Sequence, residues 1–304
     1  MAFSWILCLL AVYLIESKKI LQKLSKEEIN TLLDRCRTNI FEERERFVRS
    51  TTKYERNVPS ITLMGGENVK QNEAPFSIYL HYSKYDVTAN CAGTLITDRH
   101  ILTAAHCFIL KNCETGSVLT FLSSEYWKVF YGGGCLPIAK ATCAKFQKMA
   151  RAVHVKSISI PQEYLSSPCF HNDIAIVTVN YKMILLQDAA CVAKPLEQLP
   201  NQFVLYSRGS NPKIMEKITS LMTINVSRID CEKDELSSDV KADQICTSEM
   251  SEMNMCAGDS GSGLMFKNSN KTWTVAGVAS AGTDCNIIDI TMQQRKGSQK
   301  LREP

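Results

Sequence analysis

The sequence lacks several features that would define whole classes of protein. No Cys-x-x-Cys pair occurs among its 13 cysteines, which argues against a thiolate metal site in a reduced cytosolic protein. The formal net charge is only +4 and the basic residues are scattered, so neither nucleic acid nor an anionic membrane is indicated as a partner. We therefore expect no metal ion, no cofactor and no nucleic acid, and the many cysteines indicate an oxidising compartment.

A run long enough to cross a membrane is also missing. Residues 2–15 are apolar apart from Ser4, which is short for a membrane span but typical of a signal-peptide core. We expect residues 1–17 to be a signal peptide, with secretion and no stable membrane association after its removal. The run lacks a basic segment before it and an Ala-x-Ala site after it, so an uncleaved anchor is the alternative. Removing Cys8 leaves 12 cysteines, an even number that permits complete pairing.

Residues 18–62 differ in character from the rest of the chain. Ser25 and Glu28 have the spacing of a capping box, and apolar residues then recur at helical spacing as far as Cys36. The pattern predicts a short amphipathic helix followed by a charged, polar connector. A solvated leader without a role is the alternative, but Cys36 argues against it because an unpaired thiol is a liability in a secreted protein.

From Phe76 onward the sequence predicts short β-strands. Residues 77–82, 92–96 and 100–103 have strand-like composition, turn residues lie between them, and no long helical period intervenes. Many short strands in sequence are typical of an all-β barrel or sandwich.

Three short stretches carry the residues of a nucleophilic site. Residues 256–264 contain Gly-Asp-Ser-Gly, with Ser260 on a glycine-rich turn that a nucleophile requires. His106 precedes a cysteine, and Asp173 heads an apolar strand-like run, so a base and an orienting acid are also present. A single such motif is more often an ordinary turn, but three in this order favour catalysis.

At these residues the chain resembles the trypsin-like (chymotrypsin-fold, S1 family) serine proteases, whose motifs have the chain order His, Asp, Ser. The leader with Cys36 is similar to the propeptide of the nematode branch. The resemblance implies a propeptide over residues 18–62 and a protease domain over residues 63–304. Its fold would be two packed six-stranded antiparallel β-barrels. We expect the second barrel to be incomplete, because the family continues well beyond the position of Cys285.

The resemblance also implies roles for the motif residues. Ser260 would attack the scissile carbonyl, His106 would be the general base and acid, and Asp173 would orient the imidazole. The N–H groups of Gly258 and Ser260 would form the oxyanion hole.

Activation would follow from cleavage before Leu63, which begins the sequence Leu-Met-Gly-Gly. The new amino group of Leu63 would pair with Asp259 and so assemble the oxyanion hole. The preceding residue is Thr62, and basic residues lie only farther back, at Lys53 and Arg56. Activation by a trypsin-like protease is therefore in doubt.

The specificity pocket is expected at Asn254, six residues before Ser260, with Met255 beside it. Trypsins have an aspartate at that position, so Asn254 predicts preference for an uncharged apolar side chain over Arg or Lys. A second wall would come from Ser280 and Gly282, similar to the family's Ser-Trp-Gly strand.

The cysteines pair by resemblance in four cases. The implied disulfides are Cys91–Cys107, Cys256–Cys285, Cys231–Cys246 and the propeptide tether Cys36–Cys191. For Cys113, Cys135, Cys143 and Cys169, three pairings stay open. Two Asn-x-Ser/Thr sequons, at Asn225 and Asn270, permit glycosylation.

Two functions remain compatible with the sequence. The first is a secreted serine endopeptidase, made as a zymogen, that acts on protein or peptide substrates and is activated by another protease. The second is a catalytically inactive homologue, a disulfide-stapled binding or regulatory module. The triad favours the first. Thr62, the Ser262-Gly263 pair where the family has Gly-Pro, and the short C-terminus favour the second.

Overall fold

The computed structural model describes most of the protease-like region and four residues before it. The described residues are 26, 27, 30, 36, 66–70, 72–113, 115–137, 148–166, 171–183, 189–194, 198–209, 220–231, 244–248, 254–282 and 285. The expected signal peptide, the expected cleavage point at Leu63 and the C-terminal tail lie outside them. Lys26, Glu27, Asn30 and Cys36 are helical, in the stretch where the sequence predicts a helix.

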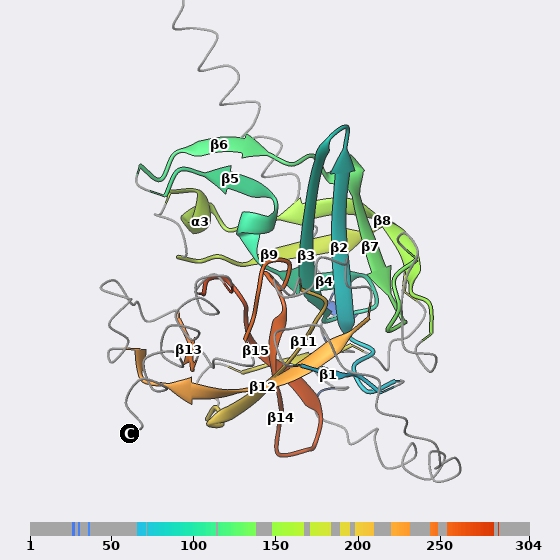
Figure 1. Ribbon diagram of the computed structural model, residues 1–304, viewed down its shortest axis with the longest axis vertical. Coiled ribbons are helices and arrows are strands. Elements are labelled where there is room, and N and C mark those ends of the chain that lie inside the picture. The colour runs from blue at the N-terminus through green and yellow to red at the C-terminus, as the bar shows by residue number, and fades with distance from the viewer. Residues whose placement is uncertain are drawn as a thin grey trace, which may run out of the picture.

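The first half of the chain forms a closed barrel in which every neighbouring pair of strands is antiparallel. In order around the barrel its strands are β2 (Ser77–Lys84), β3 (Val87–Leu95), β4 (His100–Thr103), β9 (Ala175–Val179), β8 (Arg151–Ser159) and β7 (Trp127–Tyr131). Figure 1 shows this barrel as the cyan-to-yellow half of the molecule. Its interior is filled by fully buried side chains such as Leu80, Ile101 and Trp127, since alternate residues of each strand point inward. The all-β fold class and the first barrel are confirmed.

The second half forms a sheet that is open within the described residues. Along the sheet the strands are β1 (Glu67–Asn68), β12 (Met222–Ile229), β11 (Gln202–Ser207), β14 (Gly263–Lys267), β15 (Trp273–Val278) and β10 (Cys191–Val192), while β13 (Cys246–Thr247) pairs with β12. Within the described residues the sheet has seven strands, and β1 and the parallel strand β10 pair with its two ends.

One hydrophobic cluster extends across both halves, and the second sheet has a further cluster of its own. Phe76, just before β2, makes edge-to-face contacts with Tyr206 of β11 and Trp273 of β15, at ring-centroid distances of 5.6 and 5.8 Å. Met265 and Val275 of the second sheet belong to the same buried cluster as the first barrel's interior. Burial of this apolar surface is the main term that holds the two halves together.

Shorter elements surround the junction. They are the 3₁₀ helices η2 (Ala105–Cys107) and η3 (Ser124–Tyr126), the hairpin of β5 (Ile109–Lys111) and β6 (Val118–Phe121), and the helix α3 (Gln162–Ser166). Lys111 ties the hairpin to α3, because its ammonium donates to the carbonyl oxygen of Tyr164 at 2.6 Å.

Four disulfides join described residues, and they are the four pairs that the resemblance implies. They are Cys36–Cys191, Cys91–Cys107, Cys231–Cys246 and Cys256–Cys285. Cys113 and Cys135 are also disulfide-bonded, but Cys143 and Cys169 lie outside the described residues. Among the described helices, none combines the length and apolar character needed to cross a bilayer.

Candidate active site

His106 is held where the first barrel meets the second sheet. It lies in η2, directly after β4 and the buried residue Ala104. The disulfide between Cys91 of β3 and Cys107 ties this turn to the barrel. The position of the imidazole is therefore set by two adjacent barrel strands.

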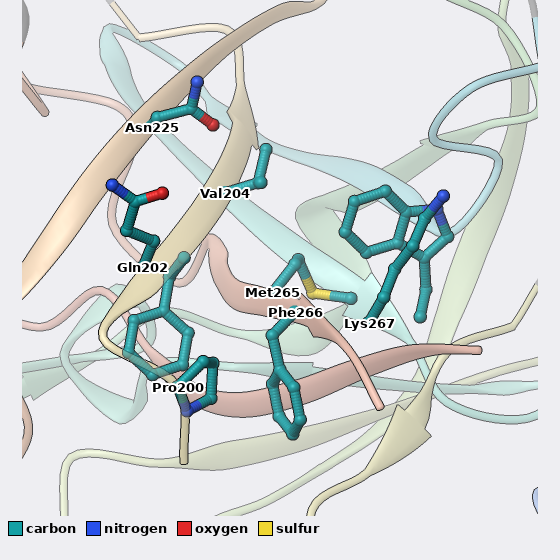
Figure 2. A pocket seen from close by; sticks show the side chains of 9 residues that line it. Pro200, Gln202, Val204, Asn225, Met265, Phe266 and Lys267 are labelled. Atoms are coloured by element: carbon teal, nitrogen blue, oxygen red, sulfur yellow. The ribbon is translucent and has the colours of Figure 1, made fainter. Parts of the chain in front are cut away.

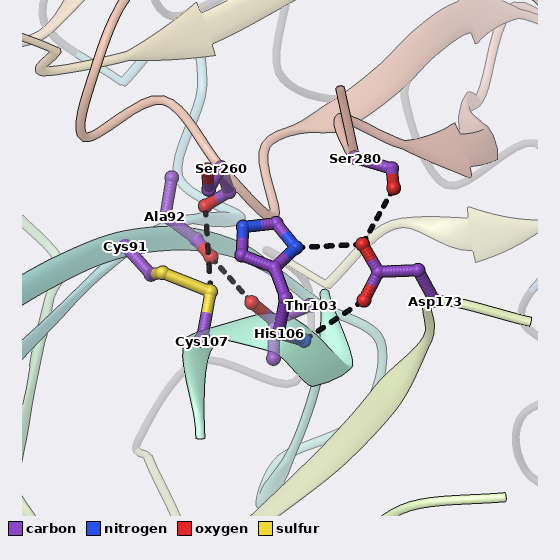
Figure 3. Close-up of a disulfide and its surroundings, with 8 residues drawn as sticks. All are labelled: Cys91, Ala92, Thr103, His106, Cys107, Asp173, Ser260 and Ser280. Atoms are coloured by element: carbon purple, nitrogen blue, oxygen red, sulfur yellow. Dashed lines mark hydrogen bonds and ion pairs between the residues drawn. A yellow bond between two sulfur atoms is a disulfide. The ribbon is translucent and has the colours of Figure 1, made fainter. Parts of the chain in front are cut away.

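Asp173 lies at the start of the segment that leads into β9, and its carboxylate is directed at His106. Oδ1 accepts a hydrogen bond from the backbone N–H of His106 at 2.8 Å, and Oδ2 lies 2.6 Å from Nδ1 of the imidazole. The preceding residue, Asn172, has φ 53°, a left-handed conformation that asparagine tolerates. This turn places the carboxylate beside η2 (Figure 3).

The environment of Asp173 favours its ionised form. Burial acts to raise its pKa, but the hydrogen bonds and charge of His106 and the hydroxyl of Ser280 outweigh burial and hold the pKa below its usual value. The Ser280 hydroxyl donates to Oδ2 at 2.5 Å. An anionic carboxylate fixes the imidazole tautomer with its proton on Nδ1, which leaves Nε2 as the proton acceptor.

Ser260 lies on a turn between the two halves of the molecule. Gly258 and Gly261 have φ of 94° and 83°, which glycine adopts without strain. A side chain at Gly261 would begin only 2.1 Å from Oγ1 of Thr103 and 2.4 Å from the carbonyl oxygen of Ala92. The absence of a side chain there lets the turn pack directly against β3 and β4, and the N–H of Ala92 donates to the carbonyl oxygen of Ser260 at 2.7 Å.

Figure 3 shows the imidazole of His106 between Asp173 and Ser260. The hydrogen bonds on the Asp173 side are formed, whereas within the described residues no hydrogen bond joins Ser260 Oγ to His106. Unliganded sites commonly have a loose contact between nucleophile and base that tightens when substrate binds. The structure thus brings the three residues together and leaves one contact unformed.

Backbone N–H donors lie beside Ser260. In the part of the chain that the structure describes, the N–H groups of Gly258 and Ser260 donate to no acceptor, whereas the intervening Asp259 N–H donates to the carbonyl oxygen of Cys256. Two free N–H groups on one tight turn can bind the oxygen of a carbonyl that acquires negative charge.

The side chain of Asp259 points away from this turn into a buried cradle. Its Oδ1 accepts from the N–H of Gly209 at 2.6 Å and its Oδ2 from the N–H of Cys256 at 2.8 Å. A side chain at Gly209 would begin 2.2 Å from the carboxylate, so only glycine fits. Burial raises the pKa of Asp259 to about 6, although the two N–H donors act to lower it.

The residues expected in the specificity pocket differ in burial and in contacts. Asn254 is buried, its Oδ1 accepts from the N–H of Met255 at 2.9 Å, and its Nδ2 has no hydrogen-bond partner among the described residues. Met255 packs against the core of the second sheet, and Gly282 is exposed. The hydroxyl of Ser280, which the resemblance places in the pocket wall, donates to Oδ2 of Asp173. The Ser-x-Gly pattern in the sequence indicates that Ser280 belongs to the site, but only the fold shows that its hydroxyl contacts Asp173.

The described residues offer one group with metal-ligand spacing, formed by Cys91, His106 and Cys107. Both of its sulfurs are in a disulfide, so neither is available as a thiolate ligand.

A groove of about 290 Å³ lies outside this site, beside the single residue pair, Val204 and Met265, that joins β11 to β14. Figure 2 shows Phe266 and Lys267 on one side of it and Gln202 on the other. No triad residue lines this groove. Asn225, the first expected glycosylation site, is exposed and forms part of its wall.

Comparison with known sequences places this geometry among proteases. The sequence model of the trypsin family matches residues 63–294, and that of the nematode trypsin-6-like family matches residues 6–118.

Individual relatives are distant in sequence. Chymotrypsin-C of Bos taurus is 26% identical over 241 residues, which cover 75% of this chain and 82% of that protein. Spaetzle-processing enzyme of Drosophila melanogaster is 28% identical over 243 residues, which cover 73% of this chain and 60% of that protein. Trypsin-like protease try-5 of Caenorhabditis elegans is 24% identical over 245 residues, which cover 70% of this chain and 74% of that protein.

Proposed function

The chain belongs to the trypsin family of serine proteases, and on that premise we propose that it is a secreted endopeptidase, made as a zymogen, that hydrolyses peptide bonds through Ser260, His106 and Asp173. The observation that carries the proposal is the pair of contacts between Asp173 and His106, at 2.8 and 2.6 Å. Those contacts orient a base toward a serine on a tight turn.

The chemistry follows from these positions. Nε2 of His106 takes the proton of Ser260 as Oγ attacks the substrate carbonyl, and the anionic Asp173 stabilises the imidazolium that forms. The tetrahedral oxygen is bound by the N–H groups of Gly258 and Ser260. His106 then protonates the leaving amine, an acyl-enzyme remains, and water attacks it with His106 again as the base. The low pKa of Asp173 keeps this carboxylate charged at neutral pH.

Zymogen activation is supported by the buried carboxylate of Asp259. Cleavage before Leu63 would create an ammonium group that can pair with it, and the trypsin-family match begins at residue 63. The disulfide Cys36–Cys191 would keep residues 18–62 attached after cleavage. Because Thr62 precedes the cleaved bond, the activating protease has no basic residue there to recognise.

Substrate preference is proposed from the pocket residues. The buried side chain of Asn254 carries no charge, so a substrate Arg or Lys would be desolvated without a counter-ion. We infer preference for an uncharged apolar residue, with Met255 and the open position at Gly282 shaping the pocket.

Secretion is supported by the apolar N-terminal run and by the disulfides, which persist in an oxidising compartment. The sequons at Asn225 and Asn270 are proposed glycosylation sites, and Asn225 is exposed on β12.

The test is to express the full chain in secretory cells, process it at Leu63, and treat it with a fluorophosphonate probe. Labelling that is lost in Ser260→Ala but kept in the control Ser262→Ala supports the proposal. Folded, processed and disulfide-bonded protein that stays unlabelled would contradict it and favour the inactive, disulfide-stapled binding or regulatory module.

A further inference from the structure

A short strap, residues 132–136, lies between the first barrel and the second sheet. On the barrel side, the N–H of Cys135 donates to the carbonyl oxygen of Lys148 at 3.0 Å, and the N–H of Ala150 donates to the carbonyl oxygen of Cys135 at 2.6 Å. A side chain at Gly133 would begin 2.5 Å from the backbone of residues 149 and 150. The strap is therefore seated directly on the segment that leads into β8 of the barrel.

On the other side the strap is bound by the second sheet. The N–H of Leu221 donates to the carbonyl oxygen of Gly134 at 2.7 Å. Nη2 of Arg208, at the end of β11, donates to the carbonyl oxygen of Gly133 at 2.6 Å. The strap thus links the barrel to the place where β11 ends.

Arg208 is an unusual residue for that place. Its side chain is only 5% exposed, and among the described residues it has no ion-pair partner. Its Nε is buried and has no hydrogen-bond acceptor within the described part of the chain. Burial lowers the pKa of Arg208 to about 10. Burying a cation without a counter-ion is destabilising, and apolar residues of similar size often replace buried charges at no loss of stability. Stability alone therefore gives little reason for an arginine here.

Arg208 is connected to the candidate active site through the next residue, Gly209. Gly209 follows it directly and donates its N–H to Oδ1 of Asp259 at 2.6 Å. The carboxylate fills the space where a side chain of Gly209 would begin. Asp259 in turn separates the two residues, Gly258 and Ser260, whose N–H groups are free within the described part of the chain. A displacement of Gly209 would therefore displace the carboxylate and the turn that carries it.

We propose that Arg208 is a positioning residue for the oxyanion hole: its hydrogen bond to the strap at Gly133 holds Gly209 in place against Asp259. The proposal rests on the proposed function, since it concerns the same turn. In this proposal the strap, which contacts the first barrel, stabilises the position of the Asp259 carboxylate. Arg208 touches no reacting atom and acts through Gly209 and Asp259.

The first test compares Arg208→Met, Arg208→Lys and the control Arg228→Met in processed protein. Arg228 is an exposed arginine on the adjacent strand β12. We expect kcat to fall about tenfold to a hundredfold in Arg208→Met, with KM unchanged. This fall is smaller than the fall in kcat that follows removal of a whole oxyanion-hole donor, because Arg208 acts only through its neighbours. The melting temperature should not fall, and Arg208→Lys should recover part of kcat, because its ammonium can donate once to Gly133. Arg228→Met should match wild type.

The second test needs no catalysis. In uncleaved Ser260→Ala protein, hydrogen exchange of the segment with the Gly209 amide should be about tenfold faster with Arg208→Met than with Arg228→Met. If the wild type is not labelled at Ser260, the proposed function fails and this exchange measurement alone decides the role of Arg208.

Several outcomes would overturn the role of Arg208. They are unchanged kcat and exchange in a folded Arg208→Met, a rise in KM with constant kcat, and a loss of kcat that only follows a loss of folded protein. If Arg208→Met is not secreted, Arg208→Lys decides: an intermediate kcat supports the proposal, and values equal to wild type in both assays overturn it.

Discussion

The buried carboxylate of Asp259 should make the stability of the uncleaved chain depend on pH. The group has an ordinary pKa of 3.8, and burial raises the pKa to about 6 in the folded chain. A pKa raised by about two corresponds to about 3 kcal/mol, because a change of one in pKa is worth about 1.4 kcal/mol. Since the folded pKa exceeds the unfolded one, this contribution is fully present below about pH 4. It is lost as the pH rises through 6.

The measurement compares two uncleaved proteins, Ser260→Ala alone and Ser260→Ala with Asp259→Asn. Urea unfolding at a series of pH values from about 4 to about 7.5 gives the free energy of unfolding of each. All other titrating groups are common to both, so the difference isolates Asp259. We expect the protein with Asp259 to lose about 3 kcal/mol more than the asparagine variant across this pH range. The asparagine variant should also be less stable at low pH, because its amide cannot accept from both Gly209 and Cys256.

Cleavage before Leu63 supplies the matching control. If the new ammonium pairs with Asp259, the folded pKa falls below the ordinary value of 3.8, and the stability from this group is present above that value and lost as the pH falls. The pH dependence should therefore change sign between the uncleaved and cleaved proteins. Parallel curves for the aspartate and asparagine proteins, or an unchanged slope after cleavage, would show that this account of Asp259 is wrong.

Three further predictions concern the site and its tether. Asn254→Asp should raise kcat/KM for substrates cleaved after Arg by about a hundredfold or more, measured with a peptide library, because it supplies the missing counter-ion; wild-type preference for Arg would contradict it. Ser280→Ala should lower kcat about tenfold, because the hydrogen bond that helps to keep Asp173 ionised beside His106 is lost; an unchanged kcat in folded protein would refute this role. After activation, the propeptide should stay attached on a non-reducing gel and separate in Cys36→Ser, whereas a free Cys36 thiol in the wild type would exclude the tether to Cys191.

The sequence by itself determined the fold class and the residues of the candidate site. His106, Asp173 and Ser260 each lie in a short contiguous motif, and a motif of this kind encodes its own turn through glycines and neighbouring cysteines. Strands are equally local, since alternation over a few residues decides which side is buried. Residues 100–103, which the sequence predicts to be a strand, form β4 with the same bounds.

Only the tertiary structure decided how distant residues meet around those motifs. Ser280 reaches Asp173 across 107 positions of the chain, Arg208 reaches Gly133 across 75, and Gly209 reaches Asp259 across 50. No periodicity or composition specifies such contacts, because a hydrogen bond depends on the packing of whole sheets to within a few tenths of an ångström. The same holds for the open second sheet, whose end strands β1 and β10 pair through long-range contacts. The sequence identifies the residues of the candidate site, and the packing of the two halves determines which contacts hold them in position.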